Sequence, residues 1–301
     1  MSIKILKPGL FSTVQDLGRK GYEHIGFAGA GAMDQFSFKV AQSLINNDGP
    51  AIEYTLIGPT IQFNTQNTFV ITGGSVNASL NNKTISMNSV ILAEKGDILK
   101  IGAITKGARG YLTFGQSINV PPIAESYATH TRSSIGGFKG RKLLANDVIT
   151  VKINNDFKEN IGKTIHLQDD LLPENNIIHI LQGPQFEAFS EEARAKIVNH
   201  PYLITEQSDR MGYRLEGDSV APINQADIIS EPVALGSVQV PNDGQPIILL
   251  NDKQTIGGYT KIATVCKFDL PKLAQMKPQD TIQFKWISFQ ERSEERRVGK
   301  E

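Results

Sequence analysis

The chain has no excess of charge of either sign. Its 301 residues include 31 Lys plus Arg and 31 Asp plus Glu, and no basic run is interleaved with aromatic residues. Proteins that bind nucleic acid usually carry a basic patch or tail that neutralises phosphates. The composition therefore predicts no nucleic-acid partner.

Long hydrophobic runs and cysteines are equally scarce. No stretch approaches the roughly 20 apolar residues that span a bilayer, and the first residues follow a strand pattern that is unlike a signal peptide. Cys266 is the single cysteine, so it has no partner for an internal disulfide, as is common in a reducing compartment. We therefore expect a cytoplasmic location, no membrane partner, no metal site, and a buried structural role for Cys266.

Short runs rich in β-branched residues recur along the sequence instead. Helical periodicity is limited to three short segments, residues 34–45, 190–197 and 270–276. Many short strands with few helices predict a closed or sandwiched β architecture.

Composition also suggests how the chain divides. Residues 154–176 are polar and acidic and form the candidate linker, so we expect an N-terminal domain over 1–155 and a C-terminal domain over 177–290. The last ten residues, 292–301, are almost entirely charged and look like the translation of a sequencing adapter oligonucleotide. We expect them to be a non-native tail without a role in the fold.

The most informative segment runs from Gly236 to Tyr259. Two apolar runs flank an Asp243-Gly244 turn, as in a β-hairpin, and a second turn closes on Gly257-Gly258. Polar side chains accumulate along this hairpin, at Gln239, Asn242, Gln245, Asp252, Gln254 and Thr255. Strands with so many polar residues beside glycine are expected to line a binding site.

Two other segments concentrate charged residues. In residues 208–217, a strand would place Arg210 and Arg214 on one face, where they could hold a carboxylate or phosphate. A surface ion-pair ladder is the alternative. In residues 126–141, Arg132 and Arg141 flank a Gly-Gly turn and are secondary candidates for an anion site, with hydrogen bonding to loop carbonyls as the alternative.

A glycine-rich loop, Gly29-Ala30-Gly31, precedes the first predicted helix, for which Asp34 is the expected N-cap. Helix N-terminal amides attract anions. However, neither the dinucleotide-binding spacing nor a Gly-Lys-Ser/Thr motif is present. We therefore favour a packed glycine-rich loop over a phosphate site.

Four motifs together carry a resemblance to a known family. They are SDRMGYRLEG (208–217), SEPVALGSVQVPNDGQPIILLNDKQTIGGYTKIATV (230–265), GAGAMDQFSFKVAQSLINND (29–48) and IGGFKGRKL (135–143). These motifs are similar to those of the KipA family, which is also known as the family of 5-oxoprolinase C subunits (PxpC), of allophanate hydrolase subunit 2, or of biotin-dependent carboxyltransferase subdomains A/B. The resemblance extends from residue 3 to about residue 289.

The resemblance implies a mainly β fold of two linked β-barrel-like subdomains with a few short helices, the C-terminal subdomain being cyclophilin-like. It implies a subunit of an ATP-dependent 5-oxoprolinase, a multi-subunit hydrolase that converts 5-oxo-L-proline to L-glutamate with KipI/PxpB-like and PxpA-like subunits. Other relatives imply two alternatives. One is a regulatory protein that antagonises a KipI-like kinase inhibitor, and the other is a carboxyltransferase component that uses carboxybiotin and a urea-like amide.

Cofactor motifs are missing from the chain itself. No Walker motif is present, so ATP is expected to bind to the complex, at a site that the sequence does not specify. Lys277 lacks the Ala-Met-Lys-Met context of a biotinylated lysine, so no covalent biotin is expected.

The substrates implied by the family are amides or lactams, whose reactions develop charge on an oxygen atom that needs donors. On this basis Asp252, Tyr259 and Lys261 are the candidate catalytic residues, with Asp209 and His24 as further possible proton carriers. The expected substrate-binding residues are Arg210, Tyr213, Arg214, Gln239 and Gln254. No nucleophile can be assigned.

Overall fold

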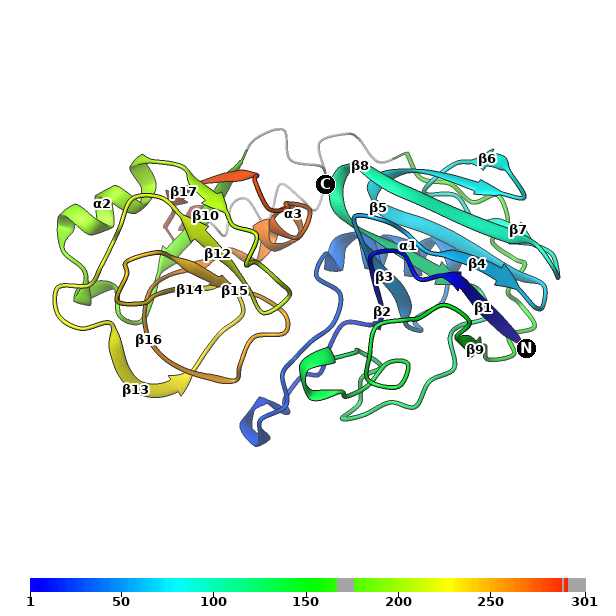
Figure 1. Cartoon of the computed structure of the whole chain (residues 1–301), viewed down its shortest axis with the longest axis horizontal. Coiled ribbons are helices and arrows are strands. Elements are labelled where there is room, and N and C mark those ends of the chain that lie inside the picture. Colours follow the sequence, from blue (N-terminus) through cyan, green and yellow to red (C-terminus); the bar gives the residue numbers. More distant parts are fainter. Residues whose placement is uncertain (167–175, 289, 292–301) are drawn as a thin grey trace. The chain divides into compact units, whose positions relative to one another are not determined.

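The computed structural model describes residues 1–166, 176–288 and 290–291. The described residues form two compact units (Figure 1): residues 1–21 and 30–166 make the first, and residues 22–29 and those from 176 onward make the second. The expected tail, 292–301, and residues 167–175 of the expected linker lie outside the described residues.

The first unit is built on a curled antiparallel sheet. Its nine strands are β1 (Ser2–Lys7), β2 (Phe11–Gln15), β3 (Ala51–Thr55), β4 (Thr60–Phe63), β5 (Asn67–Leu80), β6 (Lys83–Ile85), β7 (Ile91–Ala93), β8 (Ile98–Phe114) and β9 (Val148–Thr150). The order is β2-β3-β8-β4-β1-β9, and β5 pairs with β6, β7 and β8. Because β8 is long, one of its edges pairs with β5, while its other edge pairs with both β3 and β4. Bulges in the β5–β8 ladder add local bend and twist, which favour the curl.

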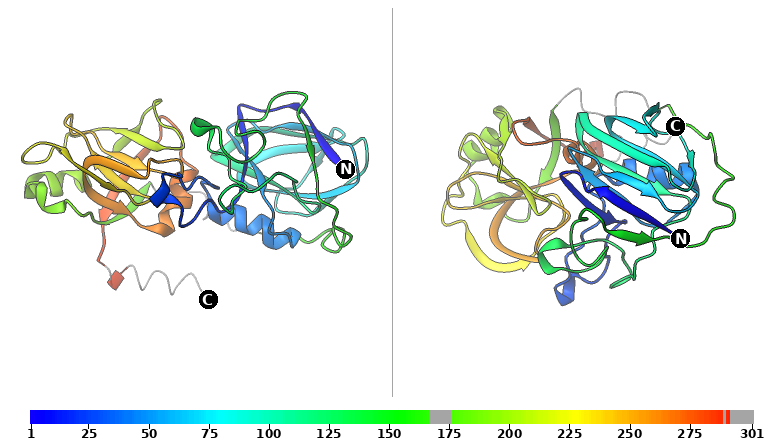
Figure 2. Two further views of the ribbon diagram at one scale, coloured as in Figure 1. Left: turned by 90° about the horizontal axis from the view of Figure 1, so that it is seen from below. Right: turned by 45° about the vertical axis from the view of Figure 1, so that its right-hand side comes forward.

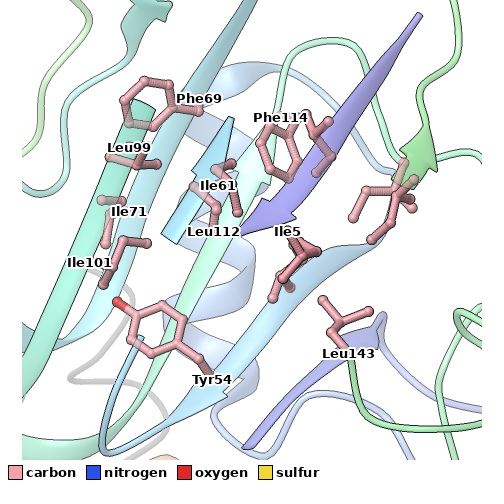
Figure 3. Packing of buried hydrophobic residues seen from close by; sticks show 14 of the residues in the cluster. Ile5, Tyr54, Ile61, Phe69, Ile71, Leu99, Ile101, Leu112, Phe114 and Leu143 are labelled. Atoms are coloured by element: carbon pink, nitrogen blue, oxygen red, sulfur yellow. The ribbon is translucent and has the colours of Figure 1, made fainter. Parts of the chain in front are cut away.

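Apolar side chains from eight of these strands fill the space enclosed by the curled sheet (Figure 3). The Phe63 ring lies 5.5 Å from that of Phe69 and 6.2 Å from that of Phe114, measured between centroids. The labelled residues of this core are Ile5, Tyr54, Ile61, Phe69, Ile71, Leu99, Ile101, Leu112, Phe114 and Leu143, all of them buried. The alternating pattern of the strands therefore produces one continuous core.

The helix α1 (Gln35–Ile45) lies along one side of this sheet (Figure 2). The Asp34 carboxylate accepts a hydrogen bond from the backbone N–H of Ser37 at 3.0 Å, which confirms the expected N-cap. Ala41, Leu44 and Ile45 of the helix pack against Val70. The short 3-10 turn η2 (Thr131–Ser133) lies in the loop that follows β8.

Residues 154–166 form part of the first unit, although the sequence places the start of a linker there. The Thr68 hydroxyl donates to the carbonyl of Phe157 at 2.7 Å, and the Val90 N–H donates to the carbonyl of Lys163 at 2.9 Å. The polar side chains of this stretch suggest a solvated linker. Its backbone nevertheless satisfies hydrogen-bonding groups of β5 and its neighbours.

The second unit contains a closed barrel of seven strands. In order around the barrel these are β10 (Ile177–Gln182), β17 (Thr281–Trp286), β11 (Tyr202–Ile204), β12 (Gly212–Glu216), β15 (Ile247–Leu249), β14 (Ser237–Val240) and β16 (Ile256–Val265). The barrel closes because β16 pairs back to β10, with Ile180 opposite Val265. An eighth strand, β13 (Asp227–Pro232), lies at the end of this sheet, where its pairing within the described part of the chain is with β16 alone.

Short helices surround this barrel. They are η1 (Glu23–Ile25), η4 (Phe186–Ala188), α2 (Glu191–Asn199), η5 (Lys267–Asp269) and α3 (Leu270–Ala274). The indole N–H of Trp286 on β17 donates to the carbonyl of Arg194 on α2 at 3.1 Å. The prediction of a mainly β fold with two barrel-like subdomains and few short helices is confirmed. The likeness of the second barrel to cyclophilin stays a prediction.

The core of the first unit gives a direct stability test. Phe114→Ala should lower the free energy of unfolding by about 3–5 kcal/mol, because it removes a fully buried ring and leaves a cavity. Phe36→Ala is the matched control, since Phe36 lies on α1 with 41% of its surface exposed, and it should change stability by only about 0.5 kcal/mol. Urea denaturation measures both. Equal losses in the two variants would contradict the proposed core.

Candidate functional site

The two arginines of residues 208–217 do not share a strand. The Asp209 carboxylate accepts hydrogen bonds from the N–H groups of Met211 at 2.7 Å and Gly212 at 3.3 Å. This turn delays the start of β12 until Gly212, so Arg210 lies outside the strand and Arg214 lies within it, exposed. The expectation of two arginines on one strand face is therefore wrong. Their substrate-binding roles stay predictions.

Arg210 instead forms a buried ion pair with Asp252. The Arg210 Nε lies 3.0 Å from Asp252 Oδ2 and Nη2 lies 2.9 Å from Oδ1. The two residues are only 7% and 5% exposed. The N–H of Asp252 also donates to the carbonyl of Arg210 at 2.9 Å. A bidentate pair fixes the plane of the guanidinium, so Asp252 acts here as the group that orients Arg210.

A second polar group, which we call the Lys261 cluster, contains Gln185, Glu231, Gln239, Gln254 and Lys261. Lys261 lies on β16 and is only 2% exposed. Its Nζ is 2.7 Å from Glu231 Oε1 and donates to the carbonyl of Tyr259 at 3.3 Å. Burying an ammonium group is unfavourable unless it is paired. The Glu231 carboxylate supplies the counter-charge.

Gln185, in the loop before η4, connects the two members of this ion pair. Its amide Nε2 donates to Glu231 Oε1 at 2.7 Å, and its Oε1 accepts from the backbone N–H of Lys261 at 3.1 Å. The pKa of the Glu231 carboxyl is lowered, first by the hydrogen bond from Lys261 and then by the one from Gln185. Glu231 is therefore held as a carboxylate.

Gln239 lies on β14 directly opposite Lys261 in the β14–β16 ladder. Its Oε1 accepts a hydrogen bond from the amide of Gln254 at 3.4 Å. Its Nε2 is buried and has no hydrogen-bond partner among the described residues. A buried N–H donor without an acceptor is costly, so this amide is suited to an oxygen atom of a ligand.

Gly257 makes the approach of these amides possible. A Cβ atom at this position would lie 2.7 Å from Gln239 Nε2 and 3.3 Å from Gln254 Nε2. A side chain here would therefore displace the Gln239 amide. The sequence marks the Gly257-Gly258 pair as a turn, but both residues lie within β16. The glycine at position 257 leaves room there for the amides of Gln239 and Gln254.

The cluster brings together a buried ammonium group, amide donors and a partly exposed carboxylate. Such a group can bind and orient an oxygen-rich small molecule, or stabilise charge that develops on one of its oxygens. Three of the residues predicted from sequence, Gln239, Gln254 and Lys261, lie together here. Asp252 lies apart from them in its pair with Arg210, and the catalytic roles of Asp252 and Lys261 stay predictions.

The two candidate tyrosines have different surroundings. Tyr213 is buried on β12, and its hydroxyl donates to the carbonyl of Met276 at 2.9 Å, which ties the strand to the end of α3. Tyr259 lies on β16 opposite Asp227 and is 39% exposed. His24 is exposed in η1.

Sequence reasoning missed Glu231, Gln185 and Lys253. Lys253 is buried, and burial lowers the pKa of its ammonium group, while Glu23 raises it. Glu231 and Gln185 reach Lys261 from positions far away in the sequence. The Ser-Glu-Pro-Val segment within the family motif is the one sequence signal that marks Glu231.

In the first unit, the amides at the start of α1 are occupied by the protein itself. The N–H groups of Gly31 and Met33 donate to the side chains of Gln15 (3.1 Å) and Glu53 (2.8 Å), respectively. The N–H of Asp34 donates to the hydroxyl of Tyr111 (2.8 Å), which itself donates to Glu53 (2.8 Å). A carboxylate thus takes the place that a phosphate would need, which supports the packed-loop interpretation.

The secondary anion candidates also differ from each other. Arg141 makes a bidentate pair with Asp147, at 2.7 and 2.8 Å, and donates to the carbonyl of Lys142 at 2.9 Å. The hydrogen bond from Arg141 is the main cause that lowers the pKa of the Asp147 carboxyl. This favours the structural alternative for Arg141. Arg132 is exposed in η2.

Two kinds of feature are absent from the described residues. Within residues 1–166, 176–288 and 290–291, no group of three or more His, Cys, Asp or Glu residues is placed to hold a metal ion. In the same part of the chain, no helix has the length and hydropathy needed to cross a membrane.

Comparison with known proteins identifies similar chains. The family model "Carboxyltransferase domain, subdomain A and B" matches residues 25–286. The chain is 34% identical to the C subunit of the Escherichia coli 5-oxoprolinase over 292 residues, which cover 96% of this chain and 92% of that protein. It is also 34% identical to the protein of the same name from Haemophilus influenzae, over 98% of this chain and 94% of that protein.

A second group of similar proteins is much longer. The crystal structure of the K. lactis urea amidolyase matches with a TM-score of 0.87 at 30% identity, covering 97% of this chain and 19% of that one. The Saccharomyces cerevisiae urea amidolyase is 31% identical over 96% of this chain and 17% of that protein. This chain therefore spans about a fifth of these two proteins.

The Arg210–Asp252 pair leads to a stability prediction. Asp252→Ala should lower the free energy of unfolding by about 3–5 kcal/mol, because it leaves a buried guanidinium without its carboxylate. Arg210→Met combined with Asp252→Leu should lose less than Asp252→Ala, since both charges are removed together. Arg214→Ala, at an exposed position of β12, is the control. Urea denaturation distinguishes them, and a double variant as unstable as Asp252→Ala would rule out a dominant role for the unpaired charge.

The Arg141–Asp147 pair leads to a prediction about pH. Because the folded-state pKa of Asp147 is lowered, its contribution to stability is present above its unfolded pKa, which is about 3.9. That contribution is lost as the pH falls through the folded-state pKa. Asp147→Asn should therefore be less stable than the parent chain at pH 7. Its free energy of unfolding should also decrease less than that of the parent chain when the pH is lowered. Unfolding measured at several pH values tests this, and parallel pH profiles would contradict it.

Proposed function

The chain belongs to the family of carboxyltransferase domains with subdomains A and B, and we propose that it is the C subunit of an ATP-dependent 5-oxoprolinase. In this complex, 5-oxo-L-proline is converted to L-glutamate. The observation that carries the proposal is the match to two 5-oxoprolinase C subunits, which extends over almost the whole length of this chain and of each of those proteins. The urea amidolyases, by contrast, contain the similar region as a small part of a long chain.

The chemistry of the Lys261 cluster supports this substrate. 5-Oxo-L-proline carries a carboxylate and a lactam carbonyl, so it presents several oxygen acceptors within a small ring. The Lys261 ammonium and the Gln239 amide are donors that are buried together on neighbouring strands. Donors that the barrel strands hold in position do not have to be ordered when the substrate arrives.

ATP is assigned to the assembled complex in this proposal. The segment before α1 offers little to a phosphate group, because the amides of Gly31, Met33 and Asp34 already donate to Gln15, Glu53 and Tyr111. KipI/PxpB-like and PxpA-like subunits are the proposed partners. We propose no step for this chain in ATP hydrolysis.

A carboxyltransferase role is the second candidate. It is favoured by the similarity to urea amidolyases, which extends over almost all of this chain. In that case the substrate is a urea-like amide, and the carboxybiotin is carried by another protein. The two candidates differ in what they require: a lactam-dependent ATPase for the first and a biotin carrier for the second.

The proposed function is tested by reconstitution. The chain, co-purified with its PxpB-like and PxpA-like partners, should release ADP only in the presence of 5-oxo-L-proline. Lys261→Met should lower kcat/KM about 10- to 100-fold, because a hydrogen bond to a charged group contributes about 1.5–3 kcal/mol. Lys267→Met, which removes an exposed lysine of the same unit, is the control and should keep full activity.

Full 5-oxoproline-dependent ADP release by the two partners without this chain would refute its role in a 5-oxoprolinase. In that case a regulatory protein that binds a KipI-like partner and the carboxyltransferase component are the interpretations that remain. Transfer of carboxylate from carboxybiotin to urea, without 5-oxoprolinase activity, would establish the second candidate.

A further inference from the structure

The two members of the Lys261–Glu231 pair are held very differently. The Lys261 side chain is 2% exposed, whereas that of Glu231 is 39% exposed. The cation is therefore fixed by the surrounding protein, while its counter-ion lies at the surface. An ion pair with one exposed member can exchange that member for a ligand without leaving a charge buried alone.

The strand that carries Glu231 is attached to the barrel along one edge only. Among the described residues, strand β13 pairs with β16 alone, and the register shifts between Asp227 and Glu231. The barrel itself is closed by the pairing of β10 with β16, which does not involve β13. Glu231 can therefore move away from Lys261 without opening the barrel.

Glu231 satisfies Lys261 but leaves Gln239 unsatisfied. Residues directly opposite each other in an antiparallel ladder place their side chains side by side, and Gln239 is opposite Lys261. The buried Nε2 of Gln239 has no acceptor among the described residues. It lies close to Gly257, the residue that faces Glu231 across the β13–β16 ladder. The unused donor is thus on the side from which Glu231 enters.

The carboxylate of a ligand has the negative charge and the two acceptor oxygens that this arrangement requires. One of its oxygens can accept from Lys261 Nζ and the other from Gln239 Nε2, which Glu231 does not reach. We propose that Lys261 and Gln239 bind the carboxylate group of a small organic acid, and that Glu231 occupies Lys261 as an internal substitute until the acid displaces it. The inference deepens the proposed function and rests on it for the identity of the acid, 5-oxo-L-proline.

A neutral substrate does not suit this position. A urea-like amide has no carboxylate and would leave Lys261 with Glu231. 5-Oxo-L-prolinamide, in which a carboxamide replaces the carboxylate, is the matched neutral probe. It keeps the ring and the lactam but loses the charge.

The test is equilibrium binding to the co-purified complex and to the chain alone, by calorimetry, with 5-oxo-L-proline and its carboxamide as probes. The acid should bind, and the carboxamide should bind at least about tenfold more weakly. Glu231→Gln should raise the affinity for the acid about tenfold. Removing the internal competitor increases the fraction of molecules in which Lys261 is available to bind. Lys261→Met and Gln239→Leu should weaken it, while Lys267→Met should have no effect.

Two outcomes would overturn the proposal. One is equal affinity for the acid and the carboxamide, including the absence of binding by both. The other is a loss of affinity for the acid in Glu231→Gln that is as large as the loss in Lys261→Met, since Glu231 would then be part of the binding site. The Lys261→Met/Glu231→Gln double variant removes both charges of the pair together. If its urea midpoint equals that of the parent chain, a loss of acid binding in this variant is not caused by unfolding.

These outcomes are independent of the reaction. If the acid binds as described but the complex shows no 5-oxoproline-dependent ADP release, the proposed function fails and the carboxylate site stands. If ADP release occurs and the carboxamide binds as well as the acid, the carboxylate site fails and the proposed function stands.

Discussion

The structure of the second unit depends on the two edges of β16. One edge pairs with β14, and the other pairs with β10 and β13. The pairing with β10 closes the ring of seven strands, so that the sheet has no free edge there. Closure also buries residues on β14 and β16 that are polar, and each of these must then find a partner within the protein or in a ligand. The Lys261 cluster is the result of this requirement.

Two buried cations of this unit, Arg210 and Lys261, meet the requirement in opposite ways. Arg210 is paired with an equally buried carboxylate through two hydrogen bonds, and the residues concerned are also joined through the backbone. Lys261 is paired with a carboxylate on a strand that the barrel does not need for closure. The first pair is suited to holding a loop in position. The second keeps a positive charge available in a buried place, which is what the recognition of an anion needs.

Much of this organisation could be predicted from sequence. The alternating strands, the cap at Asp34 and the polar hairpin from Gly236 to Tyr259 all depend on local patterns. Local patterns failed where the structure depends on distant partners. The Asp209 turn moved Arg210 out of the strand, and the contacts of Glu231 and Gln185 with Lys261 join segments that no periodicity connects.

Barrel closure also has a consequence for the order of events during synthesis. Ile180 pairs with Val265 on β16 and with Trp286 on β17, so β10 leaves the ribosome long before the strands that complete its pairing. Until β16 and β17 have been made, the nascent second unit can form only an open sheet with unpaired edges, which is a species prone to wrong association. In the first unit the longest ladder joins β5 to β8, where Leu80 pairs with Leu99. Pairing between positions so near in the chain closes quickly. The N-terminal unit can thus fold while the C-terminal barrel still waits for its last strands.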